Sequence, residues 1–250
     1  MYVMKDYIEN RLKNNLMKLD ECLREHSVYN CEKCKDLTFI LKEDVAIPCE
    51  CRSLKICKEI LKNSGISEEF RKKTFSNFDY SFSMEALDSF RIANTYVKNF
   101  ENMKKDRKNS IIFMGQVGSG KTHLSLAIAN KLMDKGIGVL YMSYRDCIIT
   151  LKQNIMEEEV YKKLTNRYKN ARVLLIDDLF KGGVTKSDIN IIFEIVNYRY
   201  FNNLPMIVST EKHFEELIEI DEAIGSRLIE MSKDYMIKIK GKNLNYRIYG

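Results

Sequence analysis

The sequence predicts an α/β fold built on a parallel sheet, with a small cysteine-bearing module ahead of it. From residue 110 onward, short apolar runs alternate with helical stretches, the alternation typical of a parallel sheet covered by helices on both faces. The apolar runs show no polar alternation, as expected for strands buried on both sides. Four cysteines gather between residues 31 and 51. A chain of 250 residues accommodates one such domain and a small module.

The first hundred residues are predicted to contain two helices and a connector. Residues 1–25 place apolar side chains at steps of three and four, which describes one face of an amphipathic helix. These side chains are Ile8, Leu12, Leu16, Leu19 and Leu23. Residues 60–83 contain Gly65 and several Ser, Asn and Asp turns, which is typical of a connector. A second helix is expected over residues 84–103.

The remaining residues supply the sheet. Strands are predicted at residues 111–114, 139–144, 173–178 and 206–210. Helices are expected between them, over 123–136, along a charged stretch that ends near 169, and over 188–203. A final pair of segments, 235–241 and 246–250, is expected to add an edge to the sheet.

Composition favours a soluble, cytoplasmic protein. No apolar run approaches the ~18–20 residues needed to cross a bilayer, and the N-terminus mixes acidic, basic and apolar residues, unlike a secretory signal. The net charge of +6 is compatible with a polyanionic partner without requiring one, since solubility alone explains such a value. The seven cysteines are better suited to metal binding than to disulfides in a cytosolic protein.

The segment Gly115-Gln116-Val117-Gly118-Ser119-Gly120-Lys121-Thr122 matches the phosphate-binding P-loop at every fixed position. Glycines let successive amides turn toward a phosphate, and the following helix adds its positive N-terminal end. Lys121 is predicted to reach the β- and γ-phosphates, and Thr122 to ligate Mg²⁺. An apolar strand precedes the loop and an amphipathic helix follows it, as the motif requires. The sequence therefore predicts that the chain binds ATP and Mg²⁺.

A second acidic element completes this prediction. The apolar run Val173–Ile176 ends in Asp177 and Asp178. Asp177 is predicted to hold magnesium through water, and Asp178 to orient or deprotonate the attacking water. Without the P-loop, the two acids would suggest only a strand that ends in solvent.

The cysteines predict a zinc site. Cys31 and Cys34 have the spacing of a zinc knuckle, and Cys49 and Cys51 follow fourteen residues later. The intervening residues are expected to form two short strands that bring the pairs together. The alternative is four free thiols. Two substitute ligands are conceivable, Cys57 and, more remotely, His26, whereas Cys22 and Cys147 are taken as structural.

Together these motifs resemble the bacterial replicative helicase loaders of the DnaC/DnaI type and their phage relatives. The resemblance covers most of the chain and includes "IPCEC", "TFSNFD", "GQVGSGKTHL", "VLLIDDL", "FEIVNYRY", "IVST" and "IGSRL". It implies an AAA+ P-loop NTPase with a truncated lid, and it places Asp177 and Asp178 in the catalytic acidic pair. It also implies that Arg227 is an arginine finger that completes a neighbour's site, so that the ATPase domain self-associates. The family strand usually ends in Ser-Thr-Asn, whereas Glu211 follows Thr210 here, so Thr210 is the substitute γ-phosphate sensor.

The resemblance also implies partners and a domain plan. Residues 1–70 would dock on a hexameric replicative helicase, residues 71–107 would connect, and residues 108–250 would form the ATPase domain. Single-stranded DNA is expected to contact basic and aromatic residues between the two ATP motifs, although a solvated charged helix explains them equally well. These residues are Arg145, Lys152, Tyr161, Lys162, Lys163, Arg167, Tyr168 and Lys169.

Two rival functions remain open. Transposition helper ATPases of the IstB type share the ATPase half of the pattern, although the cysteine module argues against that role. A nucleotide-switched adaptor that hardly hydrolyses ATP is the third reading, and the intact pair Asp177 and Asp178 argues against it.

Overall fold

The computed structural model describes residues 29, 31–42, 45–52, 55, 62–81, 83–241 and 245–249. The chain divides into two compact units, Met1–Lys55 and Ile56–Gly250. The predicted helix over residues 1–25 lies outside the described residues, as do Cys22, His26 and Cys57. The boundary at residue 55 differs from the expected one at 70, because Ile66 and Phe70 pack against the core of the second unit.

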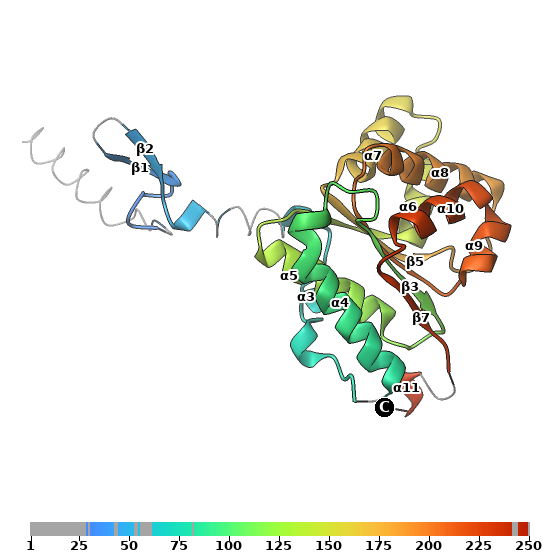
Figure 1. Ribbon diagram of the computed structural model, residues 1–250. Helices are drawn as coiled ribbons and strands as arrows, with labels where there is room; N and C mark the ends of the chain where they lie inside the picture. Colours follow the sequence, from blue (N-terminus) through green and yellow to red (C-terminus); the bar gives the residue numbers. More distant parts are fainter. Residues whose placement is uncertain are drawn as a thin grey trace, which may run out of the picture. The chain divides into compact units, whose positions relative to one another are not determined.

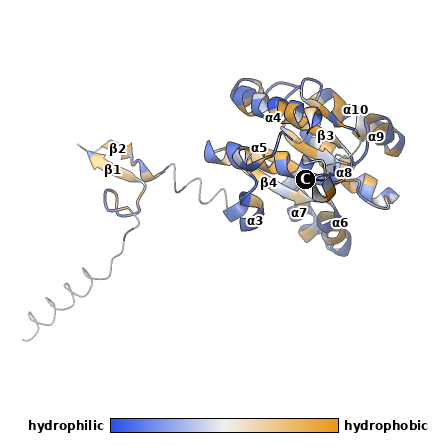
Figure 2. Cartoon of the chain, turned by 90° about the horizontal axis from the view of Figure 1, so that it is seen from below, coloured by the Kyte–Doolittle hydropathy of each residue, from blue (hydrophilic) through white to orange (hydrophobic). Residues whose placement is uncertain are grey.

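The first unit contains an antiparallel hairpin between β1 (Phe39–Lys42) and β2 (Val45–Pro48). Phe39 lies opposite Pro48 and Lys42 opposite Val45. Cys31 and Cys34 precede the hairpin, and Cys49 and Cys51 follow it, so the pairing of the strands brings both ends together. Hydrophobic residues occur along both strands (Figure 2), and most of them are exposed.

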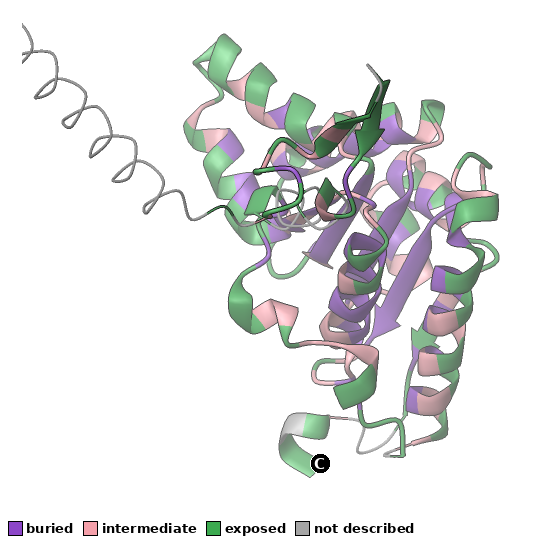
Figure 3. Cartoon of the chain, turned by 90° about the vertical axis from the view of Figure 1, so that its left-hand side faces the viewer, coloured by how far each residue is buried: buried purple, intermediate pink, exposed green. Residues whose placement is uncertain are grey.

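The second unit is a five-stranded parallel sheet between two layers of helices (Figure 1). Its strands are β3 (Ile111–Gly115), β4 (Val139–Ser143), β5 (Val173–Leu179), β6 (Met206–Thr210) and β7 (Met236–Ile239). They pair in the order β4-β5-β6-β3-β7, so the P-loop strand β3 lies between β6 and β7. The strands are almost wholly buried, whereas the outer faces of the helices are exposed (Figure 3).

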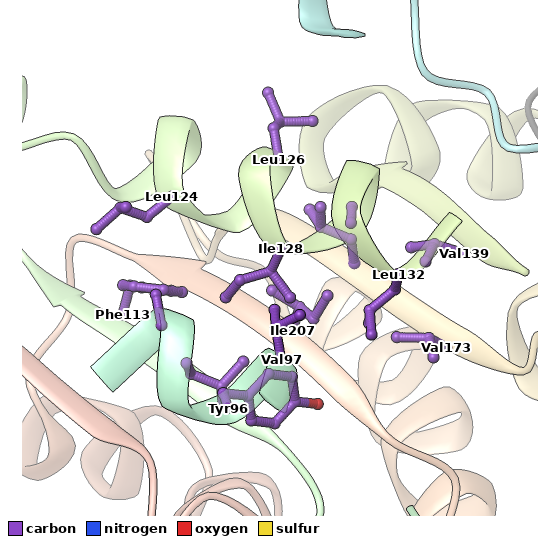
Figure 4. Packing of buried hydrophobic residues seen from close by; sticks show 14 of the residues in the cluster. Tyr96, Val97, Phe113, Leu124, Leu126, Ile128, Leu132, Val139, Val173 and Ile207 are labelled. Carbon is purple, nitrogen blue, oxygen red and sulfur yellow. The ribbon is translucent and has the colours of Figure 1, made fainter. Parts of the chain in front are cut away.

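One layer of the second unit is formed by the helices α4 (Met84–Met103) and α5 (Lys121–Asp134). Leu124, Ile128 and Leu132 of α5 point toward the strands, where they meet apolar side chains such as Phe113 and Ile207 (Figure 4). The helix α4, expected to belong to a connector, therefore contributes to the core of the second unit. The short α3 (Glu68–Arg71) and a 3-10 turn (Phe75–Asn77) lie against α5.

The other layer contains the remaining long helices. They are α6 (Tyr144–Gln153), α7 (Glu158–Asn170), α8 (Lys186–Phe201), α9 (Phe214–Ile220) and α10 (Glu222–Met231). The charged stretch before residue 169 is thus two helices, α6 and α7. Successive strand residues serve opposite layers: Ile111 and Phe113 face α4 and α5, whereas Ile112 and Met114 face α8 and α10.

The prediction of a strand over residues 246–250 is wrong. Tyr246–Tyr249 form the one-turn helix α11, in which the amides of Ile248 and Tyr249 both donate to the carbonyl of Asn245. The amide of Tyr246 donates to the carbonyl of Gly118 at 3.0 Å. These bonds use backbone groups that a sheet edge would need, so the segment contacts the P-loop and does not extend the sheet.

Candidate functional site

A cavity of about 620 Å³ opens at the carboxyl ends of the strands in the second unit. This edge of a parallel sheet is where α/β proteins bind ligands. The P-loop residues Val117–Thr122 form one wall, and the segment from Phe70 to Asp79 contributes to another. The remaining polar side chains of the lining are His123, Tyr141, Ser143, Arg145, Asp177, Asp178, Lys181, Glu211 and Tyr246.

The P-loop requires glycine at two positions beside the cavity. Gly118 and Gly120 have φ angles of +74° and +84°, in the left-handed region. A Cβ on Gly118 would lie 1.9 Å from Oδ1 of Asn245, and one on Gly120 would lie 2.7 Å from the ring of Phe78. Gly120 also immediately precedes α5. The unpaired backbone amides of the first turn of α5 therefore lie beside the cavity. The loop therefore presents backbone donors where an anion can approach closely.

Lys121 is a buried cation held by backbone carbonyls. Its Nζ donates to the carbonyls of Gly115 and Gln116, each at 2.7 Å. The part of the chain that the structure describes contains no ion pair of this lysine, and burial lowers its pKa below the ordinary value. A buried ammonium in contact only with neutral groups is costly. The arrangement fits a phosphate group, which would supply the missing negative charge.

Asp177 and Thr122, the two predicted magnesium ligands, lie together. Oδ1 of Asp177 accepts hydrogen bonds from the hydroxyls of Thr122, at 2.9 Å, and Ser209. Oδ2 accepts from the hydroxyl of Tyr141 at 3.1 Å. Burial raises the pKa of Asp177, and the bond from Ser209 works against that rise. A carboxylate and a hydroxyl are the oxygen ligands that Mg²⁺ takes beside a nucleotide, so these residues fit the ion.

Asp178, the predicted water-activating acid, also lines the cavity but is not free. Its Oδ2 accepts from Nζ of Lys181 at 2.7 Å, and its amide donates to the hydroxyl of Ser209 at 2.9 Å. Lys181 contacts Glu211 as well, with 3.3 Å between Nζ and Oε1. Sequence reasoning did not assign Tyr141, Lys181, Ser209 or Glu211 to the site. The one available signal was the departure from the family pattern at Glu211.

The structure does not bring Thr210 to the cavity. Its hydroxyl is buried, donates to the carbonyl of Leu179 at 2.8 Å, and accepts from the amide of Lys212 at 3.1 Å. Neighbouring strand residues point to opposite faces, so Ser209 faces Asp177 and Thr210 does not.

Arg227 lies on α10, away from the cavity lining of its own chain. Its Nη1 donates to the carbonyl of Ala223 at 2.8 Å, and its guanidinium lies over the rings of Tyr200 and Phe193 at 5.2 and 5.5 Å. A residue that acts on a neighbouring chain needs no contact with its own site. The finger assignment therefore stays a prediction.

Most of the residues predicted to contact DNA have partners within the chain. Lys152 pairs with Asp188, Lys162 with Glu158, and Lys169 with Glu194. Arg167 donates to the carbonyl of Asn63, the hydroxyl of Tyr161 donates to Glu194, and Tyr168 packs against the core. Arg145 lines the cavity. The described residues therefore do not present these groups as one free basic strip.

In the first unit, the four cysteines form a single cluster. The sulfurs of Cys31, Cys34, Cys49 and Cys51 all lie within 4.8 Å of one another. The sulfurs of Cys31 and Cys49 are 3.8 Å apart, and those of Cys34 and Cys51 are 3.3 Å apart. Four sulfurs at ~2.3 Å from a tetrahedral Zn²⁺ are about 3.8 Å from each other. The amide of Thr38 donates to the sulfur of Cys34 at 3.3 Å, the kind of outer contact that orients a ligand. The donor set fits zinc.

Comparison with known proteins gives a consistent picture. Residues 37–247 match the family described as IstB-like ATP binding protein. The phage-like element PBSX protein XkdC of Bacillus subtilis (strain 168) is 38% identical over 237 residues, which span 90% of this chain and 88% of that protein. The replicative helicase loader DnaC of Escherichia coli (strain K12) is 28% identical over 188 residues, or 74% of this chain and 72% of DnaC.

The fold has a counterpart among solved structures. The crystal structure of the DnaC helicase loader superimposes with a TM-score of 0.59 and 22% identity, and covers 70% of this chain and 100% of that one. The second unit thus has the AAA+ P-loop fold. None of the described helices is long and apolar enough to span a membrane.

Proposed function

Because the chain belongs to the family of IstB-like ATP-binding proteins, we propose that it is an ATPase that loads a hexameric replicative helicase onto single-stranded DNA. The proposal rests above all on one observation: a separate unit holding a cysteine cluster precedes the ATPase unit. An ATPase that acts on a protein ring needs a part that grips the ring and a part that uses nucleotide. The helicase loader named among the relatives supports the choice of partner.

In the ATPase unit, each residue of the P-loop edge has a role in this proposal. The amides of Gly115–Thr122 and the ammonium of Lys121 bind the β- and γ-phosphates. Thr122 and Asp177 would hold Mg²⁺, which would supply positive charge to the phosphates. Asp178 orients the attacking water and accepts its proton. Arg227 of a neighbouring chain neutralises charge that develops in the transition state, so turnover depends on assembly.

The first unit is the docking device in this proposal. Cys31, Cys34, Cys49 and Cys51 hold a structural Zn²⁺ that fixes the hairpin β1–β2. The described part of this unit buries only Cys34 and Cys49 among its apolar residues, so the metal supplies much of its folding free energy in this proposal. The exposed side chains of the hairpin include Leu41 and Val45. They are suited to contact a partner protein.

The proposal is tested with the purified full chain, the host's hexameric replicative helicase, and covalently closed circular single-stranded DNA. A closed ring cannot thread such a circle, so stable helicase on the circle reports loading. We expect loading that requires this chain and ATP and that is lost in Lys121→Ala. Cys31→Ser with Cys34→Ser is expected to lose zinc and helicase binding while still binding ATP. The control is Cys147→Ser, a substitution in the ATPase unit, which should retain zinc, helicase binding and ATP binding.

Two results would overturn the loader function while leaving the ATPase intact. One is normal ATP hydrolysis without any complex with the helicase. The other is a stable, ATP-dependent complex with a transposase, which would make the chain a transposition helper like others of its family. A chain that binds ATP but does not hydrolyse it, with helicase and DNA present, would be a nucleotide-switched adaptor.

A further inference from the structure

Lys181 is held at the nucleotide cavity by the turn that follows β5. The amide of Lys181 donates to the carbonyl of Asp178 at 3.1 Å, which closes the turn. Asp178 and Phe180 both have positive φ angles, 55° and 58°, an unusual backbone for residues other than glycine. The ring of Phe180 is fully buried and meets Tyr144 edge to face. Burial of this ring stabilises the turn, and the turn directs the side chain of Lys181 back over Asp178.

The ammonium of Lys181 lies between two carboxylates of the cavity wall. Nζ is 2.7 Å from Oδ2 of Asp178 and 3.3 Å from Oε1 of Glu211. The hydrogen bond to Asp178 raises the pKa of Lys181, so the side chain stays charged at neutral pH. Lys121 lines the same cavity. Lys181 is thus a cation of the phosphate-binding cavity that is paired with two carboxylates, unlike Lys121, whose ammonium donates to backbone carbonyls.

Glu211 poses a problem that Lys181 can solve. A carboxylate in the wall of a triphosphate site repels the γ-phosphate, which carries negative charge of its own. Glu211 follows Thr210, the last residue of β6. Pairing with Lys181 removes the repulsion. The pair Glu211–Lys181 thus presents a tethered cation to the cavity.

The contact with Asp178 has an opposite consequence. The ammonium of Lys181, 2.7 Å from Oδ2 of Asp178, occupies the carboxylate oxygen that would otherwise accept a hydrogen bond from the attacking water. In the nucleotide-free chain Asp178 is therefore poorly suited to activate water. A group that withdraws Lys181 from Asp178 would restore that ability, and the γ-phosphate is the anion that distinguishes ATP from ADP.

We propose that Lys181, tethered by Glu211, is the γ-phosphate-sensing residue of this chain: it leaves Asp178 to bind the γ-phosphate of ATP and so frees Asp178 for the attacking water. ADP lacks that phosphate and leaves the pair Lys181–Asp178 intact. The proposal concerns the ATP site alone, so it holds whichever protein partner the ATPase serves.

The test compares the affinity of a non-hydrolysable β,γ-methylene ATP analogue with that of ADP, each measured by calorimetry in the presence of Mg²⁺. In Lys181→Met we expect analogue affinity to fall by about tenfold or more, because a charge-assisted bond is lost and Glu211 is left unpaired. ADP affinity is expected to change less than about twofold. Lys186→Met, an exposed lysine of α8, is the matched control and should alter neither.

Two further variants separate sensing from a simple change of charge or fold. Lys181→Arg keeps a cation on the tether and should keep most of the preference for the analogue. Lys181→Met combined with Glu211→Gln removes the repulsion together with the cation, and should recover part of the analogue affinity that Lys181→Met loses. Unaltered ADP binding in every variant shows that the site is folded and still binds nucleotide.

Three outcomes would overturn the proposal. Equal losses for the analogue and ADP would make Lys181 a general counter-charge of the cavity. Unchanged analogue affinity would show that the γ-phosphate does not contact Lys181. Faster hydrolysis in Lys181→Met with unchanged affinities would show that the lysine only restrains Asp178.

Discussion

At the scale of single residues, the site depends on how the carboxylate of Asp177 is held. Three hydroxyls converge on it, from Thr122, Ser209 and Tyr141. Thr122 belongs to α5 and Ser209 to β6. Tyr141 comes from β4, which lies on the other side of β5 from β6. Among the described residues, only Tyr141 bonds to Oδ2, so it fixes the rotation of the carboxylate about its last bond.

We therefore predict that Tyr141→Phe weakens the binding of Mg²⁺ more than that of nucleotide. The ring stays, and with it the edge contact to Phe70 at 5.5 Å, but the hydroxyl that orients Asp177 is lost. Outer contacts of this kind change metal affinity about 10–100-fold. Titration of turnover with Mg²⁺ should show a half-maximal concentration about tenfold higher.

A matched control for this prediction lies three residues on. Tyr144 is fully buried, and its hydroxyl has no partner among the described residues. Tyr144→Phe removes the same atom without touching Asp177 and should leave the Mg²⁺ requirement unchanged. If both variants raise the requirement equally, Tyr141 has no specific role in orienting the carboxylate.

Which residues of the site could be predicted depended on whether the motif itself fixes their position. Lys121, Thr122 and Asp177 follow from the P-loop and the strand that ends in two acids. Ser209 and Thr210 are adjacent hydroxyls at the end of one strand, and a shift of one residue exchanges their faces. Nothing in the local pattern says which of them faces Asp177. The position of Lys181 depends on a turn with two left-handed residues, Asp178 and Phe180. The local sequence does not predict that conformation.

At the scale of elements, the cavity depends on the segment from α3 to the turn Phe75–Asn77. Asn130 of α5 joins that segment to the P-loop helix. Its Nδ2 donates to three carbonyls that follow or end α3, those of Phe70, Arg71 and Lys73, at 3.3, 3.2 and 2.8 Å. Nε2 of His123, two turns earlier on the same face of α5, contacts the carbonyl of Thr74 at 2.9 Å. These bonds satisfy backbone groups at a helix end that would otherwise need water.

We predict that Asn130→Asp loosens this wall of the cavity. The substitution keeps the size of the side chain but replaces the amide donor by an acceptor that faces three carbonyls. The free energy of unfolding should fall by about 1–3 kcal/mol. Thermal unfolding should show this loss, and the affinity for ADP should fall with it, because Phe78 and Asn77 line the cavity.

The control uses the same substitution where it breaks a single bond. Asn154 is a half-buried residue at the end of α6, and its side-chain amide donates only to the carbonyl of Thr150 among the described residues. Asn154→Asp makes the same change of charge and should alter neither the unfolding temperature nor ADP binding appreciably. Equal stability of the two variants would contradict a special role for Asn130.

Elements were predictable where burial sets their pattern. The strands β3, β5 and β6 are continuous apolar runs, and they were expected within a residue or two of where they lie. The alternating pattern at 246–250 led to a wrong prediction of a strand, because the backbone bonds of this segment go to Gly118 and Asn245 and not to a strand. The helix α4 was expected, but an apolar face does not say which core it joins. That depends on the sheet order, which places β3 between β6 and β7.

At the scale of the whole molecule, the chain consists of two units with different requirements for stability. The unit Ile56–Gly250 has two large apolar clusters, one on each side of its sheet. The described part of Met1–Lys55 contributes only two residues to the buried apolar set, Cys34 and Cys49, and both belong to the sulfur cluster. We therefore expect the stability of the first unit to depend on a metal held by its cysteines, and that of the second to depend on its core.

This division predicts the effect of a zinc chelator on the full chain. We expect the chelator to abolish the protection of the first unit against proteolysis, because its cysteines would lose the ion that joins them. ADP affinity and the main thermal transition should remain as they were, since the second unit does not depend on the metal. Loss of nucleotide binding on chelation, with Mg²⁺ restored, would mean that the units are not independent.

The last prediction concerns the assembly of several chains. Arg227 does not line the cavity of its own chain, so its predicted action requires a neighbour. We expect Arg227→Gln to bind ATP normally but to lose the rise of turnover per chain with protein concentration. Such fingers contribute about 10³–10⁵-fold in rate.

Asp178→Asn should bind ATP and hydrolyse none, although its arginine is intact. Mixing the two inactive variants should restore hydrolysis, because the finger of one chain meets the complete site of the other. If the mixture stays inactive while both variants bind ATP and assemble, Arg227 does not act across chains.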